Sequence, residues 1–172
     1  MNTIILFIFL NVFNFSLTYN CQGDTSTSFI RGHYRDVLSE QNGGLLENAR
    51  QIYLFGNGDQ KSPLRNNLYF SQVYFGHARC DRNEFMIFPS TQAYQINTIR
   101  IRFWNYDTRI HNFEVYCDEV KIYEGFAQGV VIIKFSDRIV QKVRIKSLGN
   151  SIDGYMSILK VQAFYQLWEM SI

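Results

Sequence analysis

After residue 50, much of the chain alternates apolar and polar positions with a period of two. The pattern is clearest at residues 98–104 and 139–146, where isoleucine, valine and phenylalanine alternate with arginine and lysine. Such alternation is typical of β-strands that bury one face. Further strands are predicted at residues 51–55, 68–75, 85–88, 113–117, 119–123, 130–135 and 156–164.

These short strands, about eight or nine in all, are separated by turns that contain glycine and aspartate. The main turns are predicted at residues 56–59, 125–129 and 149–154, and Asp118 alone separates two strands, which indicates a tight turn or bulge. Regular spacing of strands and turns without long helical periods predicts an all-β domain, either a sandwich or a barrel. We assign residues 51–165 to this domain, residues 19–50 to an irregular polar segment and residues 166–172 to a C-terminal tail.

The first eighteen residues differ from the rest. They carry no charged side chain, and residues 4–10 form an apolar run, which is short for a membrane span of about 20 residues. Ser16 and Thr18 have the spacing that a signal peptidase requires, so residues 1–18 are predicted to be a cleaved signal peptide. An uncleaved anchor and a buried strand are the alternatives. The prediction places the protein outside the cell or in the lumen of the secretory pathway.

Composition and charge narrow the class of protein. The 172 residues are 47% hydrophobic with a formal net charge of +2, which indicates one globular domain and argues against an obligate nucleic-acid partner. The three cysteines are Cys21, Cys80 and Cys117, so at most one internal disulfide forms. Cys80 and Cys117 could pair if the fold brings them together, which would leave Cys21 for an intermolecular bond.

No pattern predicts catalysis or a metal centre. The chain has no Gly-x-Ser-x-Gly motif and its three histidines are scattered singly. The carboxylates between Glu114 and Glu124 fit a solvated strand face better than the opposed pair of a glycosidase. His77 and Cys80 lie three residues apart, but a structural zinc site needs four ligands, and no Asp-x-Asp-x-Asp run is present to bind calcium. We therefore predict no enzyme, no catalytic residue and no metal or other cofactor.

Cations and aromatic residues offer weaker signals. Arg100 and Arg102 lie on one outward strand face, and Lys142, Arg144 and Lys146 lie on another. Were those strands neighbours, the five cations would form a stripe for a polyanion; the alternative is a polar face interleaved with acids such as Glu114. The inward phase of the strands includes Phe103, Trp104, Phe113, Phe135 and Phe164.

Two further aromatic residues fall in predicted turns, Tyr106 and Phe126. An exposed aromatic ring at such a position can stack on a sugar, enter a membrane interface or fold back over the edge of the sandwich. The sequence leaves these alternatives open.

Residues 96–109, with the run Ile-Asn-Thr-Ile-Arg-Ile-Arg-Phe-Trp-Asn-Tyr-Asp, resemble the discoidin domain (coagulation factor V/VIII C-type). The likeness continues through residues 112–115, 141–146 and 157–165, and is greatest to the variant found in BTB/POZ-type adaptor proteins. It implies a galactose-binding-like jelly-roll β-sandwich whose ligand-binding loops gather at one end. The family's loop of Asp-Gly with a following tryptophan is not clearly present, and Cys21 has no cysteine near Tyr165 to pair with.

By this resemblance, the ligand-contacting loops are residues 56–66 and 77–83. Their candidate ligand-binding residues are Asn57, Asp59, Lys61, Arg65, His77, Arg79, Asp81 and Arg82. Asparagine and aspartate accept hydrogen bonds from sugar hydroxyls, and arginine donates in a fork to vicinal oxygens or acidic groups.

The resulting expectation is a secreted, non-catalytic binding module that recognises a glycan or an extracellular partner protein, with an anionic phospholipid surface as a further ligand class. Such jelly-roll domains sometimes hold a structural calcium ion, for which this sequence gives no support. The alternatives are a structural or assembly protein of an extracellular or vesicular matrix and, behind it, a glycan-active enzyme. The sequence does not determine the oligomeric state.

Overall fold

The computed structural model describes residues 36–52, 63–64, 77–104 and 107–167 of the chain. Seven antiparallel strands form one sheet in the order β1-β2-β7-β3-β6-β4-β5, preceded by a single 3-10 turn. The elements are η1 (Glu40–Asn42), β1 (Arg50–Ile52), β2 (His77–Cys80), β3 (Phe85–Phe103), β4 (His111–Cys117), β5 (Val120–Ala127), β6 (Val130–Asn150) and β7 (Met156–Phe164).

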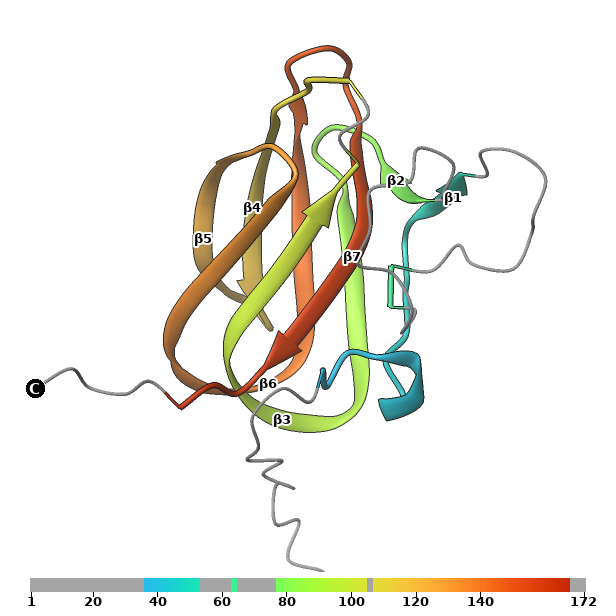
Figure 1. The fold of residues 1–172 in the computed structure, drawn as a ribbon. Helices are drawn as coiled ribbons and strands as arrows, with labels where there is room; N and C mark the ends of the chain where they lie inside the picture. Colours follow the sequence, from blue (N-terminus) through green and yellow to red (C-terminus); the bar gives the residue numbers. More distant parts are fainter. Residues whose placement is uncertain (1–35, 53–62, 65–76, 105–106, 168–172) are drawn as a thin grey trace, which may run out of the picture.

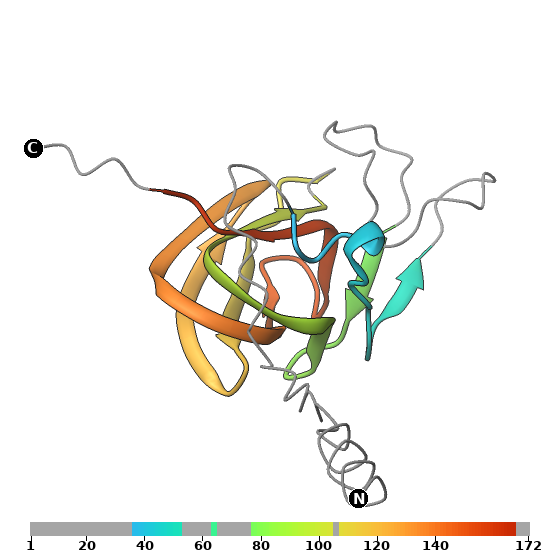
Figure 2. The same cartoon turned by 90° about the horizontal axis from the view of Figure 1, so that it is seen from below.

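Two long strands, β3 and β6, turn this sheet into a sandwich. The beginning of β3 pairs with the end of β6 (Phe85 opposite Lys146), whereas the end of β3 pairs with the beginning of β6 (Arg102 opposite Val130). Their register shifts twice, between Pro89 and Tyr94 and between Ile96 and Thr98, and the strands bend in this region. Figure 1 shows β3 curving round the lower end of the molecule, and Figure 2 shows the curled sheet from below. The two halves of the sheet therefore face each other across a core.

The alternating pattern selects that core. Phe103, Phe113, Met86, Ile99 and Ile145 are fully buried between the halves of the sheet. Burying such side chains contributes about 1.5–3 kcal/mol each relative to leaving them exposed. The all-β class, the sandwich architecture and the inward phase predicted for Phe103 and Phe113 are confirmed.

The predicted strands were wrong in three places. His77–Cys80, predicted as the first part of a ligand-contacting loop at residues 77–83, form strand β2, which pairs with β1 and β7. Residues 85–88 and 98–104 belong to one strand, β3, and residues 130–135 and 139–146 both belong to β6. Polar residues near the bends, such as Ser90 and Asp137, break the alternation without ending the strand, because the chain there passes from one half of the sheet to the other. The predicted strand at 68–75 lies outside the described residues.

The two turns predicted on either side of β5 are both present, one as expected and one shorter. Residues 118 and 119 join β4 to β5, with Asp118 in the left-handed region at φ 50°, so the tight turn is confirmed. The turn predicted at 125–129 is shorter than expected, because β5 continues to Ala127 and only Gln128 and Gly129 remain. Phe126 is therefore a strand residue rather than a turn residue.

Cys80 and Cys117 are both free and buried. Cys80 ends β2 beside Met156, and Cys117 lies opposite Val120 and Val143, so no disulfide joins them. Burial raises the pKa of each thiol to about 12, which leaves both unreactive near neutral pH. Cys21 lies outside the described residues.

Within the described part of the chain, no helix is long and apolar enough to span a membrane. The same residues contain no group of three or more histidine, cysteine, aspartate or glutamate side chains placed to hold a metal ion.

Candidate functional site

A pocket of about 340 Å³ opens where β4, β5 and β6 reach the loop end of the sandwich. We define the loop end as the end of the sandwich that carries the connections at residues 81–84, 107–110, 128–129 and 151–155. The volume of the pocket lies at the lower end of the range for small-molecule sites, about 300–1,000 Å³. The pocket is lined by Arg82, Ile110, Asn112, Phe126, Leu148, Gly149, Asn150, Ser151, Asp153 and Gly154.

One cross-strand row forms the floor and one wall of the pocket. Asn112 of β4 lies opposite Phe126 of β5 on one side and opposite Gly149 of β6 on the other. Directly opposed residues of antiparallel strands project from the same face, so these three positions share the outer face of the sheet. The Phe126 ring is 70% exposed. It presents an apolar surface beside the polar groups of the pocket.

Glycine at position 149 makes the hollow. Gly149 adopts φ +100°, a conformation that side-chain-bearing residues rarely adopt, and it follows a shift in register between β4 and β6. A Cβ built there would lie 3.6 Å from Cδ of Arg82. The stem of Arg82 therefore crosses the bare backbone of Gly149, and the guanidinium reaches the pocket.

The β2–β3 turn that carries Arg82 is attached to β6. The Asn83 amide donates to the Ser147 carbonyl at 2.7 Å, and the Ser147 amide donates to the Glu84 carbonyl at 2.9 Å. Asn83 takes φ 67°, which asparagine tolerates better than most residues. These bonds fix the turn at the edge of the pocket.

The β6–β7 turn forms the other rim, and Asn150 organises it. The side-chain oxygen of Asn150 accepts the amides of Ile152 and Asp153, both at 2.7 Å. Its side-chain nitrogen donates to the Asp153 carboxylate at 2.6 Å and to the Tyr155 carbonyl. An asparagine that mimics backbone turns in this way is a recognised turn former. The Asn150 side chain is thereby committed to holding the turn.

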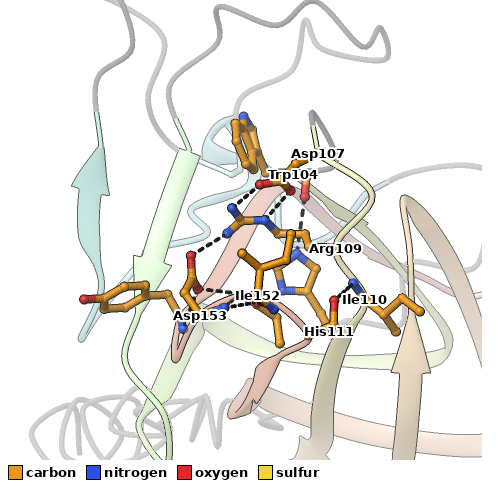
Figure 3. A network of polar contacts seen from close by, with 10 residues as sticks. Trp104, Asp107, Arg109, Ile110, His111, Ile152 and Asp153 are labelled. Carbon is orange, nitrogen blue, oxygen red and sulfur yellow. Dashed lines mark hydrogen bonds and ion pairs between the residues drawn. The ribbon is translucent and has the colours of Figure 1, made fainter.

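Arg109 joins this turn to the chain that leads into β4 (Figure 3). Its guanidinium donates to both carboxylate oxygens of Asp107 and, at 3.1 Å, to Oδ2 of Asp153. It also lies over the Trp104 ring, with Cζ 4.7 Å from the centroid. Only 8% of Arg109 is exposed. A bidentate arginine that is largely shielded from water is a strong brace between two loops.

The titration behaviour of these groups follows from the contacts. The hydrogen bond from Arg109 lowers the pKa of Asp107. Burial alone would raise the pKa of Asp153, but hydrogen bonds from the Tyr155 amide and Asn150 and the charge of Arg109 outweigh it, so the pKa is lowered. Both carboxylates are ionised at neutral pH.

His111 supports the loop end from below. It is fully buried, and its ring stacks on Phe103 with centroids 4.7 Å apart. Its Nε2 contacts the Trp104 carbonyl oxygen (Figure 3), at a distance of 3.2 Å. Burial lowers the pKa of His111, so the ring is neutral at pH 7 and Nε2–H donates to that carbonyl. The histidine holds the end of β3 in place.

Of the eight residues proposed from the sequence, the structure describes four, and of these four Arg82 lines the pocket. Arg82 lies at its edge, whereas His77 is buried against the ring of Trp104, with centroids 5.5 Å apart. Arg79 stacks over the ring of Tyr155 at 3.0 Å, and Asp81 belongs to the Arg82 turn without lining the pocket. Asn57, Asp59, Lys61 and Arg65 lie outside the described residues.

The sequence prediction missed the contribution of β4 and the β6–β7 turn. Gly149–Gly154 was recognised as a turn, and its Asn-Ser-Ile-Asp-Gly sequence carries the side chains that organise it. Asn112 gave no signal, because its position opposite Phe126 and Gly149 depends on strand register. Tyr106, the other aromatic residue considered, lies outside the described residues.

Of the two alternatives for the five cations, the continuous stripe does not form. Arg100 and Arg102 lie opposite Ile132 and Val130, in the half of the sheet away from β4. The other three cations belong to a group that we call the charge ladder, on the outer face of β4, β5 and β6. It consists of Glu114, Glu119, Lys121, Glu124, Lys142, Arg144 and Lys146.

Every cation of the charge ladder is paired with a carboxylate. Glu119 contacts Lys142 at 2.9 Å and Arg144 at 2.8 Å, while Glu114 contacts Lys121 at 3.2 Å and Lys146 at 3.6 Å. The interleaved alternative therefore holds for Lys142, Arg144 and Lys146. Of the carboxylates between Glu114 and Glu124, the three glutamates are ion-paired. Asp118 instead accepts the backbone amides of Gln141 and Lys142.

Comparison with known proteins supports the fold. No protein-family model matches the chain, and a search of curated proteins finds no similar sequence. Among solved structures, the family 32 carbohydrate-binding module of AlyQ, in complex with 4,5-unsaturated mannuronic acid, matches with a TM-score of 0.50 and 16% identity. The match covers 71% of this chain and 99% of that module.

Two further structures give similar results. A truncated AlyQ with this module and an alginate lyase domain has the same TM-score and identity; the match covers 71% of this chain but only 35% of that protein. The family 32 module of C. perfringens NanJ, in complex with galactose, has a TM-score of 0.49 and 12% identity over 69% of this chain and 92% of that one.

The AlyQ likeness shows that the fold is the galactose-binding-like β-sandwich, which discoidin domains share. The fold that the resemblance implied is therefore confirmed. The narrower likeness to the variant in BTB/POZ-type adaptor proteins has no support in these comparisons.

Proposed function

We propose that this protein is a non-catalytic carbohydrate-binding module whose ligand occupies the pocket at the loop end. The observation that carries the proposal is the exposed Phe126 ring in one row with Asn112 and Gly149. An aromatic face offers apolar surface to the C–H face of a pyranose, while the neighbouring polar groups bind its hydroxyls. The AlyQ module, which has the same fold, was solved with a bound sugar.

The chemistry of the pocket favours binding over hydrolysis. A glycosidase of the usual kind places two carboxyl groups on either side of the scissile bond. Among the described residues that line the pocket, Asp153 carries the one carboxylate, and its oxygens are held by Arg109, Asn150 and the Tyr155 amide. The described lining of the pocket therefore lacks the pair of groups that would cleave a bound sugar, which supports a binding role.

The experiment is a glycan array of neutral and acidic oligosaccharides probed with the full chain, followed by calorimetry on the best ligand. Phe126→Ala is expected to weaken binding about tenfold or more, since stacking on an aromatic ring contributes of the order of 1 kcal/mol or more. The matched control is Val120→Ala, which removes another exposed apolar side chain from the opposite end of β5. Its affinity is expected to equal that of the unchanged protein.

Two results would overturn the proposal. One is that the folded protein binds no glycan on the array. This result would overturn the proposal even if the protein bound anionic vesicles or a protein partner. The other is equal weakening by Phe126→Ala and Val120→Ala, which would place the ligand elsewhere.

We also propose that residues 1–18 direct secretion, which would bring the module to extracellular glycans. The support is the apolar run at residues 4–10 with Ser16 and Thr18 at the spacing for cleavage. When the C-terminally tagged chain is expressed in eukaryotic cells, N-terminal sequencing of the tagged protein in the culture medium should give Tyr19 as its first residue. Tagged protein retained in the cells with an intact Met1 would contradict this.

A further inference from the structure

The groups of the pocket that are still able to bind a ligand are mainly donors. In the described part of the chain, no hydrogen bond or ion pair holds the Arg82 guanidinium, which carries five N–H donors and is exposed. The Ser151 hydroxyl oxygen accepts the Ile110 amide at 3.0 Å, which leaves its O–H to donate. The Asn112 side-chain amide can donate and accept.

The side-chain acceptors of the β6–β7 turn already accept hydrogen bonds from the protein. Oδ1 of Asp153 accepts from Asn150 and from the Tyr155 amide, and Oδ2 accepts from Arg109. The Asn150 side-chain oxygen accepts two backbone amides. The negative charge of Asp153 is thus directed towards Arg109, away from a ligand, while the positive charge of Arg82 is not offset within the pocket lining.

The neighbouring carboxylates of the Arg82 turn do not offset the positive charge of Arg82 within the pocket. Asp81 and Glu84 do not line the pocket, and the Glu84 carboxylate accepts the Asp81 amide at 3.1 Å, which closes the turn on itself. The Arg82 stem instead lies against Gly149, whose partner on β4 is Asn112, and both Arg82 and Asn112 line the pocket. A ligand over this row would meet the Phe126 ring on one side and the guanidinium on the other.

We propose that the pocket selects acidic sugars, that is, pyranose units that carry a carboxylate or sulfate group, and that Arg82 binds the anionic group. This rests on the proposed function and adds the ligand class. The Phe126 ring would contact the C–H face of the sugar, and Arg82 would donate charge-assisted hydrogen bonds to the anion. Neutral sugars would occupy the same pocket more weakly, because they leave the guanidinium without an anionic partner.

The test compares matched ligands by calorimetry with the full chain. Oligogalacturonate is compared with its methyl ester, which keeps the sugar and removes the charge, and sulfated dextran oligosaccharides are compared with unsulfated ones. We expect the acid to bind about tenfold more tightly than its ester, with an advantage that shrinks as salt is raised. The carboxylate and sulfate arms show which anion is preferred.

Arg82→Gln should reduce binding of the acidic ligand about tenfold and leave binding of the ester nearly unchanged. The control is Lys142→Gln, which removes a cation from the charge ladder on the same face of the sheet. Equal effects of the two substitutions would show attraction to overall charge and would overturn the proposal. Equal affinity for the acid and its ester would overturn the selectivity for acidic sugars and leave the proposed glycan binding intact. Loss of all binding with Phe126→Ala, together with no loss with Arg82→Gln, would also overturn it, because recognition would then involve only the neutral face of the sugar.

Discussion

The outer face of β4, β5 and β6 carries two regions that lie one row apart along the strands. In the row of Glu114 and Lys146, every cation is matched by a carboxylate. In the adjacent row of Asn112, Phe126 and Gly149, the nearby cation, Arg82, has no such partner among the described residues, and an aromatic ring stands exposed. The same sheet therefore carries one surface whose charged groups are paired with each other and, beside it, a surface whose cation and aromatic ring are available to a ligand.

The difference shows why counting charges does not locate a binding site. The charge ladder holds four cations, yet each already has a carboxylate at 3.6 Å or less. The loop end uses Arg109 in the same way, as a brace between Asp107 and Asp153. What distinguishes the pocket is the combination of a missing side chain at Gly149 with donors that the fold has not used.

The largest effect should come from removing the brace of the loop end with Arg109→Met. This leaves Asp107 and Asp153 without their shared cation, and hydrogen bonds to charged groups contribute roughly 1.5–3 kcal/mol net. We expect a loss of about 2–3 kcal/mol in the free energy of unfolding, measured with urea, together with a clear loss of sugar affinity. A variant that is as stable as the unchanged protein and binds sugar normally would show that the turn does not need Arg109.

Acid should weaken the loop end before the charge ladder. Because burial lowers the pKa of His111 from its usual 6.5, its contribution to stability is complete above about pH 6.5 and is lost as the pH falls towards the lowered value. The pKa values of Glu114 and Glu119 are also lowered, from 4.5, so their contributions are lost only below about pH 4.5. The slope for one proton cannot exceed about 1.4 kcal/mol per pH unit.

Urea unfolding between pH 7 and pH 5 measures this contribution. His111→Gln keeps a donor for the Trp104 carbonyl and removes the titrating ring, so its stability should vary less over that range. Identical pH profiles for the variant and the unchanged protein would rule out His111 as the acid-sensitive group.

The smallest effect should come from Glu119→Gln in the charge ladder. Glu119 is about two-thirds exposed, so water and salt screen its ion pairs. We expect no measurable change in the free energy of unfolding, and we expect sugar affinity to stay unchanged. A large loss of affinity would show that the two regions of the face are coupled.

The sequence predicted the class of fold because the alternation of the strands is strong. The core phase of β3, with Ile99, Ile101 and Phe103 inward, follows directly from a period of two. The continuity of β3 and β6 does not, since a bend between two halves of a sheet interrupts the same alternation that a loop would. Local pattern cannot separate these two cases.

The candidate site was predictable only in part, for a similar reason. Arg82 and Phe126 stood out by residue type and position, but each was considered alone. That Phe126, Asn112 and Gly149 form one row depends on how β4 pairs with both its neighbours, including the register shift beside Gly149. Pairings between residues so far apart in the chain cannot be derived from a single sequence.

The central claim, that a sugar occupies the row of Asn112, Phe126 and Gly149, is tested most directly by NMR. The ¹⁵N-labelled chain would be titrated separately with oligogalacturonate and with a neutral galacto-oligosaccharide, and amide shifts would be mapped by residue. We predict that saturable shifts gather at residues 110–112, 126 and 148–154, with smaller ones at Glu114 and Lys146. Shifts centred on the charge ladder or on Arg100 and Arg102, or no saturable shifts with either sugar, would contradict it.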